Sequence, residues 1–368
     1  MPSYIHALGT AVPEAALSTE RAASLLPGIC PDARTARRMA KLIPLTGIER
    51  RHFAAMETQS DFDDPTGLYQ LAGVQPEGPG MNARSQAFDA LADRLVARLL
   101  NGFEGDDLAK VASLITVSCT HASSPGLELA VFRHSTVPHE VDRWNLGFMG
   151  CSAALAALRL ARHNTSASAL VVACELSSLH FQYSADLDQL TANLLFADGA
   201  AAVLLKDETS GVRVLHAQCV SIPAFAGQMV WWAGDFGLRL VLSPELPTTL
   251  ATHLPGAIEK FLAGASLSAR QIDHWLVHPG GPQILDAVEE SIRLPEGSLA
   301  LSRFVLRRFG NMSSPTILFI LQAAIESGLE GHVMLIAFGP GLTIEIALVE
   351  ICGPAEGILR GPQVTDDD

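Results

Sequence analysis

The feature that most restricts the fold of this chain is a pattern that occurs once in each half. In the first half an apolar strand ends at Cys119, and an apolar helix opens at Cys151, 32 positions later; the next strand starts 20 positions after Cys151. In the second half a strand ends at His278, a helix opens at Asn311, 33 positions later, and the next strand starts 22 positions after Asn311. A glycine precedes the helix-opening residue in both halves. The matched spacings predict an internal duplication.

Six segments have the character of strands that are covered on both faces. They are short apolar runs, rich in β-branched residues and bounded by Gly, Pro or polar residues. Helical patterns lie between them, at 152–163 and 315–328. Alternating strands and helices predict a layered α/β fold. The predicted strands are 111–118, 169–176, 200–205, 274–278, 332–338 and 342–351.

A duplicated chain of this kind would pack its halves around a pseudo-twofold axis. The two helix starts would then converge, so that Cys151 and Asn311 face each other and His278 arrives from a strand end between them. We divide the chain into an N-terminal half at 1–220 that carries the cysteine, a C-terminal half at 221–352 that carries the histidine and the asparagine, and a flexible acidic tail at 353–368.

Composition narrows the class of protein further. With 368 residues and 48% hydrophobic content, the chain can bury a large core. No window is long and apolar enough for a transmembrane helix, and the start lacks the pattern of a signal peptide. The six cysteines form no CxxC pair, which favours a reducing cytoplasm over a disulfide framework or a zinc site. The formal net charge of −14 argues against nonspecific nucleic-acid binding.

Cys151 is the first candidate for chemistry. It lies at the first turn of an apolar helix, where the positive end of the helix dipole and free backbone N–H groups favour the thiolate, and the thiolate is the nucleophilic form of cysteine. Gly150 allows a tight turn that could expose the sulfur. The alternative is a small buried hydrophobe, the usual role of an isolated cysteine.

His278 and Asn311 suit a partnership with that sulfur. His278 ends an apolar strand directly before Pro279-Gly280-Gly281, and it could pair with a thiolate as imidazolium or donate to an oxyanion. Asn311 offers an N–H donor that does not titrate, although it could instead only cap the following helix. Two such donors would stabilise the enolate that a malonyl thioester leaves on losing CO2. An aromatic wall, for which Phe196 is a candidate, would promote that loss by excluding water.

Five segments together resemble the type III polyketide synthases, the chalcone-synthase-like members of the thiolase superfamily. The resemblance extends from ALGTAVP near the N-terminus through TGIERRHF to residue 349, and HPGGP combined with GNMSS and GPGLT is its most specific part. It implies a thiolase fold, five-layered αβαβα and built from two duplicated halves. The segments are GFMGCSAAL, LLFADGAAAVLL, VHPGGPQILDAVE, FGNMSSPTILFIL and AFGPGLTIE.

The resemblance also implies roles for individual residues. Cys151 matches the nucleophile that the starter acylates, and His278 and Asn311 match the pair that binds the thioester carbonyl and stabilises the enolate. Phe196 resembles the first gatekeeping phenylalanine between the coenzyme A tunnel and the cavity. The further residues implied are Cys119, Thr120, His180 and Ser313 in the cavity lining, and Arg38, Lys41, Gly280 and Gly281 against coenzyme A.

Two positions depart from the family's pattern. The second gatekeeper is usually also phenylalanine, and Leu240 stands in the matching stretch GLRLVLSPELP. Trp231 or Trp232 lies where plant members often have glycine, and a bulky indole there would narrow or redirect the cavity. These departures bear on substrate shape rather than on activity.

The function predicted is that of an acyltransferase. It condenses malonyl-CoA onto an acyl-CoA starter carried by Cys151, with cyclisation to an alkylpyrone, a resorcinol or a similar product. The resemblance implies a homodimer, no metal and no redox cofactor, and leaves an acyl carrier protein open as a further partner.

Four alternatives stay open at this point. The main one is an enzyme like ketoacyl-ACP synthase III. A degradative thiolase would need a second catalytic cysteine, for which Cys352 lies too late in the chain. A papain-like hydrolase would share the order Cys, His, Asn but lacks the local signature. A catalytically silent scaffold is the last.

Overall fold

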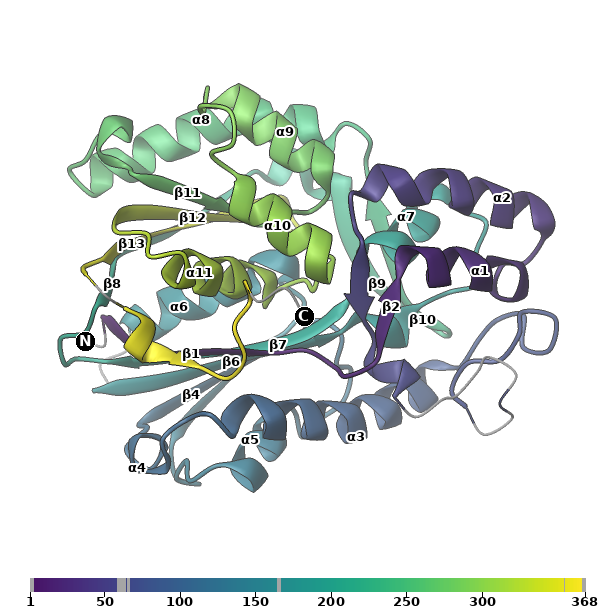
Figure 1. Cartoon of the computed structure of the whole chain (residues 1–368), viewed down its shortest axis with the longest axis horizontal. Helices are drawn as coiled ribbons and strands as arrows, with labels where there is room; N and C mark the ends of the chain where they lie inside the picture. Colours follow the sequence, from purple (N-terminus) through teal and green to yellow (C-terminus); the bar gives the residue numbers. More distant parts are fainter. Residues whose placement is uncertain (1–2, 58–63, 65–66, 164–166, 354, 366–368) are drawn as a thin grey trace.

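The fold is built around a ten-stranded mixed sheet (Figure 1). The computed structural model describes residues 3–57, 64, 67–163, 167–353 and 355–365. The strand order is β11-β12-β13-β8-β1-β7-β6-β4-β5, and β14 pairs with β1. The strands are β1 (Tyr4–Ala11), β4 (Ser113–Val117), β5 (Asp142–Leu146), β6 (Ser168–Leu176), β7 (Asp198–Lys206), β8 (Val212–Ser221), β11 (His274–Val277), β12 (Gly331–Gly339), β13 (Thr343–Ile351) and β14 (Leu359–Arg360).

The order of strands contains the predicted duplication. In one half, β4 is parallel to β6, which is antiparallel to β7, which is antiparallel to β1. In the other half, β11 is parallel to β12, which is antiparallel to β13, which is antiparallel to β8. The halves join through a short antiparallel pairing of β1 with β8. The predicted division at residue 220 falls at the end of β8, so it leaves β8 in the N-terminal half although the strand pairs with β13 of the second. The division stays a prediction.

Helices cover both faces of each half-sheet, which makes five layers in the order αβαβα (Figure 1). Two helices lie in the middle layer, between the half-sheets, and the other two pairs lie outside. The middle pair is α6 (Ala153–His163) and α11 (Thr316–Glu326); the outer pairs are α3 (Met81–Leu100) with α5 (Glu128–His134), and α8 (Leu246–Gly264) with α9 (Pro282–Ser291). The predicted thiolase-type architecture is therefore confirmed.

Alternation along the strands explains the layers. Successive side chains of a strand point to opposite faces, and Val171 packs into the core around α6 and α11 while its neighbour Leu170 packs into the core under α3. Likewise, Leu335 faces the middle layer and Ile336 faces α8 and α9. Both faces of these strands are buried, which is why they appear in the sequence as uninterrupted apolar runs.

The six predicted strands and both predicted helices are present, with ends that differ by a few residues. Strand β5 was not predicted because its residues, Asp142–Leu146, are polar or exposed at the sheet edge and form no apolar run. Strands β1 and β8 and the long outer helices α3 and α8 were not predicted either. Several of the shorter elements form a side layer that bounds the cavities described below. This group contains α1 (Thr19–Ile29), α2 (Ala33–Leu42), η1 (Ile43–Thr46), α7 (Leu187–Leu195), the hairpin of β9 (Met229–Gly234) and β10 (Gly237–Leu242), and the pair β2 (Ala16–Ser18) and β3 (Arg50–His52).

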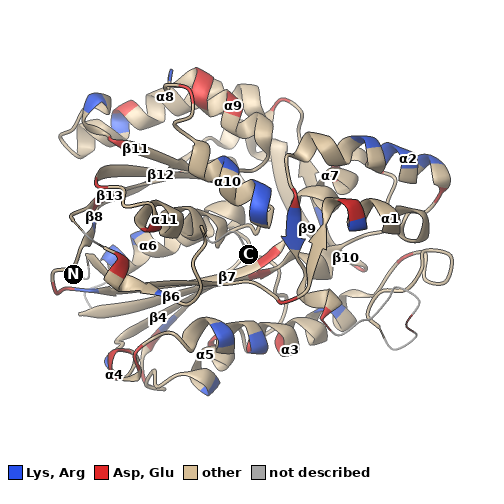
Figure 2. Cartoon of the chain, in the orientation of Figure 1, with Lys and Arg blue, Asp and Glu red and all other residues tan. Residues whose placement is uncertain are grey.

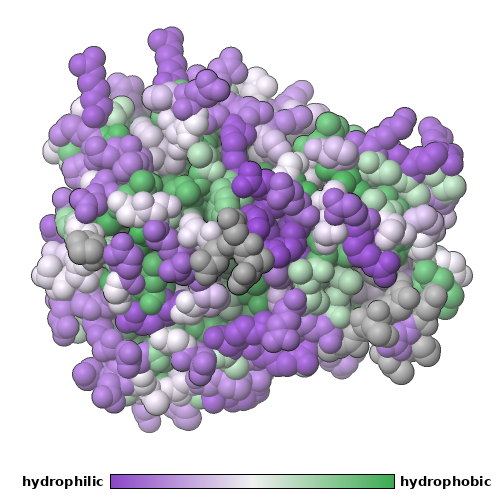
Figure 3. All heavy atoms as spheres, viewed as in Figure 1, coloured by the Kyte–Doolittle hydropathy of each residue, from purple (hydrophilic) through white to green (hydrophobic). Residues whose placement is uncertain are grey.

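The outer surface is mixed in polarity on the face shown. Hydrophobic atoms are interspersed with hydrophilic ones, and hydrophilic side chains gather where α10 (Ala300–Phe309) meets β3 (Figure 3). Basic residues lie at this seam and along α2 (Figure 2). Among the described residues, no helix is long and apolar enough to cross a membrane.

The C-terminal segment corrects one expectation. Residues 355–365 were predicted as part of a flexible acidic tail, but Leu359 and Arg360 pair in parallel with β1, and Val364 is buried. The Glu326 carboxylate accepts hydrogen bonds from the backbone N–H groups of Val364 and Thr365 at 2.8–2.9 Å. The buried Val364 side chain and the two amides paired with Glu326 hold this segment to α11. The amino-acid composition of the segment does not reveal these contacts.

Deletion of residues 355–368 should therefore destabilise the protein. The loss of Val364 burial and of the hydrogen bonds to Glu326 lowers the free energy of unfolding by about 3 kcal/mol. Urea denaturation followed by circular dichroism measures this, with deletion of residues 366–368 alone as the matched control. A midpoint unchanged by the longer deletion would show that the segment is a free tail.

Candidate active site

A cavity of about 400 Å³ opens beside the starts of the two middle-layer helices. Its size lies within the range of small-molecule sites, roughly 300–1,000 Å³. Its wall combines residues of η1, α7, the β9–β10 hairpin, the start of α8, and the turn between β11 and α9. Cys151, His278 and Asn311 all line it. The three residues that were predicted to converge are therefore brought together.

Cys151 lies in a single 3₁₀ turn, Gly150–Ser152, that leads directly into α6. Gly150 has a positive φ of 63°, and a Cβ there would lie 2.5 Å from Cδ of Pro340, so only glycine fits. Cys151 Sγ donates to Oδ1 of Asn311 over 3.9 Å. The turn thus directs the sulfur away from the helix and towards the second half of the chain.

His278 follows β11 directly, and its backbone N–H donates to Ile336 O at 2.8 Å, which continues the pairing of β11 with β12. The imidazole is 1% exposed, and among the described residues neither ring nitrogen has a hydrogen-bond partner. Buried polar groups are normally paired. A histidine that faces a cavity without a partner is therefore available to bind a ligand atom. Gly280 and Gly281 line the same cavity directly after it.

Asn311 is held by backbone on both sides rather than by a helix. Its N–H donates to Leu195 O and its carbonyl accepts from Ala197 N, both at 2.9 Å. Its side-chain Oδ1 accepts from Ser313 N at 2.8 Å, which assigns the amide orientation and leaves the NH2 group as a donor. Helix α11 begins only at Thr316, after Pro315. The alternative that Asn311 merely caps this helix is therefore wrong.

Burial dominates the electrostatics of the cysteine and the histidine. It raises the pKa of Cys151 to about 12, although hydrogen bonds with Ser313 and Asn311 oppose the shift. It also lowers the pKa of His278 to about 3. A Cys151 thiolate alone, or a His278 imidazolium alone, would therefore carry a large desolvation free energy in this pocket. Transfer of the proton from sulfur to imidazole creates both charges together, and their mutual attraction offsets part of that cost.

The predicted gatekeepers and the tryptophan are neighbours in the cavity wall. Phe196, Leu240 and Trp231 all line it. Leu240 and Trp231 are cross-strand partners in the β9–β10 hairpin, and the Trp231 ring packs edge-on against Phe196 with centroids 5.5 Å apart. Trp232 is exposed, so Trp231 is the indole that shapes the cavity.

Four other residues predicted for the cavity lining are buried but do not line this cavity. Cys119 accepts a hydrogen bond from Gly150 N at 3.0 Å, so it supports the turn that carries Cys151. Ser313 orients Asn311. Thr120 donates to Glu175, and His180 lines a second cavity that lies beyond Phe196. These four belong to the support behind the catalytic wall rather than to its surface.

Arg38 and Lys41, predicted to bind coenzyme A, are exposed residues of α2, a helix that carries several basic residues (Figure 2). They do not line the cavity, but Leu42, Leu45 and Thr46, which follow directly in the chain, do. The two cations therefore lie beside the cavity rim on the outer surface. Their contact with coenzyme A phosphates stays a prediction.

Glu175 is the functional residue that sequence analysis missed. Its carboxylate is fully buried and accepts hydrogen bonds from Cys119 N, Thr120 N, Thr120 Oγ1 and Ser314 Oγ at 2.7–3.1 Å. Burial raises its pKa to about 7. It ties the loop after β4 to the segment after Asn311. The sequence signal for Glu175 was an acidic residue inside the otherwise apolar run ALVVACEL.

Two family models match adjacent stretches of the chain. Residues 215–352 match the C-terminal domain of chalcone and stilbene synthases, and residues 48–218 match the FAE1/type III polyketide synthase-like proteins. A 1,3,6,8-tetrahydroxynaphthalene synthase from Streptomyces peucetius subsp. caesius is 29% identical over 364 residues, which is 94% of this chain and 92% of that protein.

Solved structures of type III polyketide synthases share the fold. The 1,3,6,8-tetrahydroxynaphthalene synthase of Streptomyces coelicolor A3(2) superposes with a TM-score of 0.82 at 25% identity. PKS-I of the brown alga Ectocarpus siliculosus superposes with a TM-score of 0.85 at 24% identity. In both cases the match covers 95% of this chain and 99% of the other.

Replacement of His278 should reduce the reactivity of Cys151. His278→Ala removes the predicted proton acceptor, so that only the hydrogen bonds with Ser313 and Asn311 oppose the rise in the thiol pKa that burial causes. Alkylation of Cys151 by iodoacetamide at pH 7 should slow by about tenfold or more, and its pH profile should move upward. Peptide mass spectrometry measures the rate at this residue. His274→Ala, at the start of the same strand, is the control; equal rates in wild type and His278→Ala would contradict the pairing.

Proposed function

The chain belongs to the type III polyketide synthases, a family of acyltransferases, and we propose that it extends an acyl starter held on Cys151 with units from malonyl-CoA. The observation that carries this proposal is the convergence of Cys151, His278 and Asn311 on one cavity. This cavity holds a nucleophile, Cys151, and two separate groups, His278 and Asn311, that can donate hydrogen bonds to a thioester oxygen. The family uses coenzyme A thioesters as substrates, which suits a cavity with an open rim.

Starter loading is the first proposed step. The Cys151 proton passes to His278 as the sulfur attacks the thioester carbonyl of an acyl-CoA, and the coenzyme A thiol leaves with a proton. The buried pair makes this transfer more favourable than free ionisation of the thiol, because no single charge is left in the pocket. The acyl group then occupies the cavity as a thioester of Cys151.

Decarboxylative condensation is the second proposed step. The thioester carbonyl of malonyl-CoA accepts hydrogen bonds from His278 and from the Asn311 amide. Loss of CO2 moves the bonding electron pair onto that carbonyl as an enolate, and the two donors stabilise the charge. The enolate carbon attacks the acyl group on Cys151, and the cysteine thiolate leaves. No electrons are gained or lost overall, so the step needs no redox partner.

The wall around this centre suits the chemistry. Phe196 places an aromatic ring beside the three residues, which excludes water and disfavours a charged malonyl carboxylate. Glu175 lies behind Cys119 and does not line the cavity, so its carboxyl group does not meet the malonate. Repeated extension and cyclisation to an alkylpyrone, a resorcinol or a similar aromatic product complete the proposal.

Assembly and substrate delivery are part of the proposal. We infer a homodimer in the cytoplasm, with acyl-CoA and malonyl-CoA as substrates and no metal or redox cofactor. Arg38, Lys41, Gly280 and Gly281 would meet the coenzyme A moiety near the rim. Parallel assays with acyl-CoA and with acyl carrier protein thioesters decide which carrier delivers the starter.

Two variants should separate the two steps. Cys151→Ala should abolish the acyl adduct seen by intact-protein mass spectrometry, with the fold unchanged by circular dichroism.

Asn311→Ala should reduce CO2 release from malonyl-CoA by about 100-fold and should change starter loading far less. Asn82→Ala, at an exposed amide on α3 that lines neither cavity, is the control. Chain extension in Cys151→Ala, or equal loss of both steps in Asn311→Ala, would refute the assigned roles.

A further inference from the structure

Arg51 is a buried cation that lies behind the catalytic wall. It belongs to the short strand β3, where it pairs with Leu17 of β2. The residue is only 7% exposed, and it does not line the catalytic cavity. Removal of a charged group from water is costly unless the protein supplies partners for it. No step of the proposed reaction uses this charge, so its partners indicate what it does.

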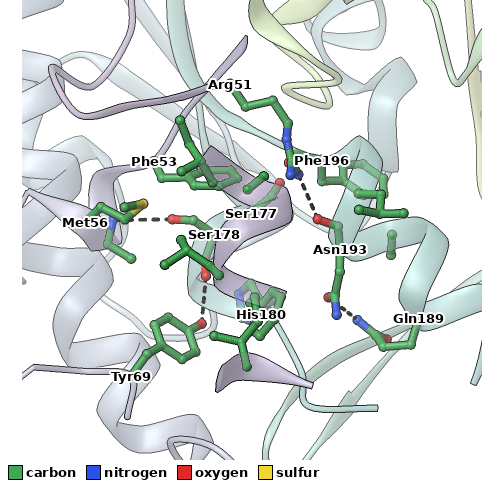
Figure 4. Close-up of a pocket in the computed structure, with 18 of the residues that line it drawn as sticks. Arg51, Phe53, Met56, Tyr69, Ser177, Ser178, His180, Gln189, Asn193 and Phe196 are labelled. Atoms are coloured by element: carbon green, nitrogen blue, oxygen red, sulfur yellow. Dashed lines mark hydrogen bonds between the residues drawn. The ribbon is translucent and has the colours of Figure 1, made fainter. Parts of the chain in front are cut away.

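The guanidinium of Arg51 binds the C-terminal end of α7. Its Nη1 donates to Asn193 O at 2.7 Å and to Phe196 O at 2.9 Å. Asn193 lies in the last turn of the helix, where carbonyl groups lack partners within the helix and where cations are favoured. Figure 4 shows the side chain of Arg51 directed towards Asn193 and Phe196. Arg51 therefore fixes the main chain at the point where α7 ends.

The same stretch of main chain holds Asn311. The Asn311 N–H donates to Leu195 O, and its carbonyl accepts from Ala197 N, both at 2.9 Å. The Phe196 carbonyl and the Ala197 N–H are the two ends of one planar peptide group. Arg51 binds the oxygen of this peptide group, and Asn311 binds its N–H. A shift of the peptide group would therefore shift the backbone of Asn311.

The aliphatic part of Arg51 contacts the residue before Asn311. Gly310 has a positive φ of 74°, and a Cβ there would lie 2.8 Å from Cγ of Arg51. Only glycine lets the two segments approach this closely. The guanidinium carbon also lies 4.8 Å from the centre of the Phe53 ring, which holds the side chain from β3 itself. Arg51 is thus in contact with both sides of the connection to Asn311.

A buried carboxylate compensates the charge of Arg51. Asp198 is fully buried and accepts hydrogen bonds from Ala54 N and Ser178 N, both at 2.7 Å. Burial lowers the pKa of Arg51 to about 10, and the attraction of Asp198 opposes this shift. The guanidinium therefore stays charged at neutral pH, and its position is determined by groups from several segments of the chain.

We propose that Arg51 is a positioning residue for decarboxylation, which aligns the Asn311 amide with the thioester oxygen of malonyl-CoA by fixing the backbone on both sides of Asn311. The inference rests on the proposed function, because that function makes the amide an enolate donor. Such a donor is effective only at the right distance from the oxygen on which charge develops, and a misplacement of about 1 Å can cost about 100-fold in rate. Starter loading uses Cys151 and His278, which other segments hold.

The test replaces the guanidinium while a side chain of similar length remains. In Arg51→Met, kcat for CO2 release from malonyl-CoA should fall about tenfold, while KM for malonyl-CoA and the rate of acyl adduct formation on Cys151 should change by less than about threefold. Arg51→Lys should recover part of the loss, because an ammonium group keeps the charge but lacks the planar donor geometry. Arg50→Met, at the preceding residue of the same strand, is the matched control and should change neither step.

A double-mutant cycle distinguishes positioning from general destabilisation. If Arg51 acts through the Asn311 amide, its replacement has nothing further to remove once that amide is gone. The protein with both Arg51→Met and Asn311→Ala should therefore release CO2 about as slowly as Asn311→Ala alone. If the two losses multiply instead, Arg51 acts by another route and the inference is wrong.

The outcomes separate this inference from the function on which it rests. If the wild-type protein releases no CO2 from malonyl-CoA, the proposed function fails. If it does release CO2, but Arg51→Met slows loading and CO2 release equally, or neither, Arg51 has only a structural role and the proposed function stands. If circular dichroism shows that Arg51→Met does not fold, Arg51→Lys decides alone. A loss of about threefold or more confined to CO2 release then supports the inference, and any other result contradicts it.

Discussion

The burial of two helices between the half-sheets is the constraint on which the rest of the structure depends. Helix α11 is buried along nearly its whole length, and α6 is buried on most of its surface. A helix buried in such a layer has apolar sides, and its first turn is where polar groups can be bound, because the backbone N–H groups there lack partners within the helix. Cys151 and Asn311 lie at or just before these starts, and the duplication brings the starts together.

Two separate groups of paired polar side chains connect the halves of the chain. Glu175, in a strand of the first half, accepts hydrogen bonds from the loop after β4 and from Ser314 in the second half. Arg159 of α6 pairs with the buried Glu345 of β13, again across the halves. An unpaired charge in this interior would be costly, so each carboxylate is surrounded by donors. The Glu175 group lies beside the reacting residues, because Cys119 contacts the turn of Cys151 and Ser314 follows Asn311.

The sequence predicted the elements that periodicity and glycine placement encode. Buried strands such as Ser168–Leu176 are long apolar runs, and Gly150 and Gly310 mark turns that only glycine accommodates. The second cavity, the packing of Val364 and the partners of Glu175 were not predictable in this way. They depend on side chains from segments far apart in the chain. The register that sets Trp231 opposite Leu240 is one example, since a shift of one residue would turn the indole to the other face.

The aromatic wall links the constraint on the fold to the selection of substrate. Phe196 is tied to Asn311 through a backbone bridge, so the main chain that carries the aromatic ring also positions the proposed enolate donor. Trp231 instead pairs with Leu240 in a hairpin outside the five layers. Under the proposed function, the two rings of the wall therefore belong to different parts of the fold. A substitution in the hairpin would change the shape of the cavity while the proposed catalytic residues stay where the two halves of the chain hold them.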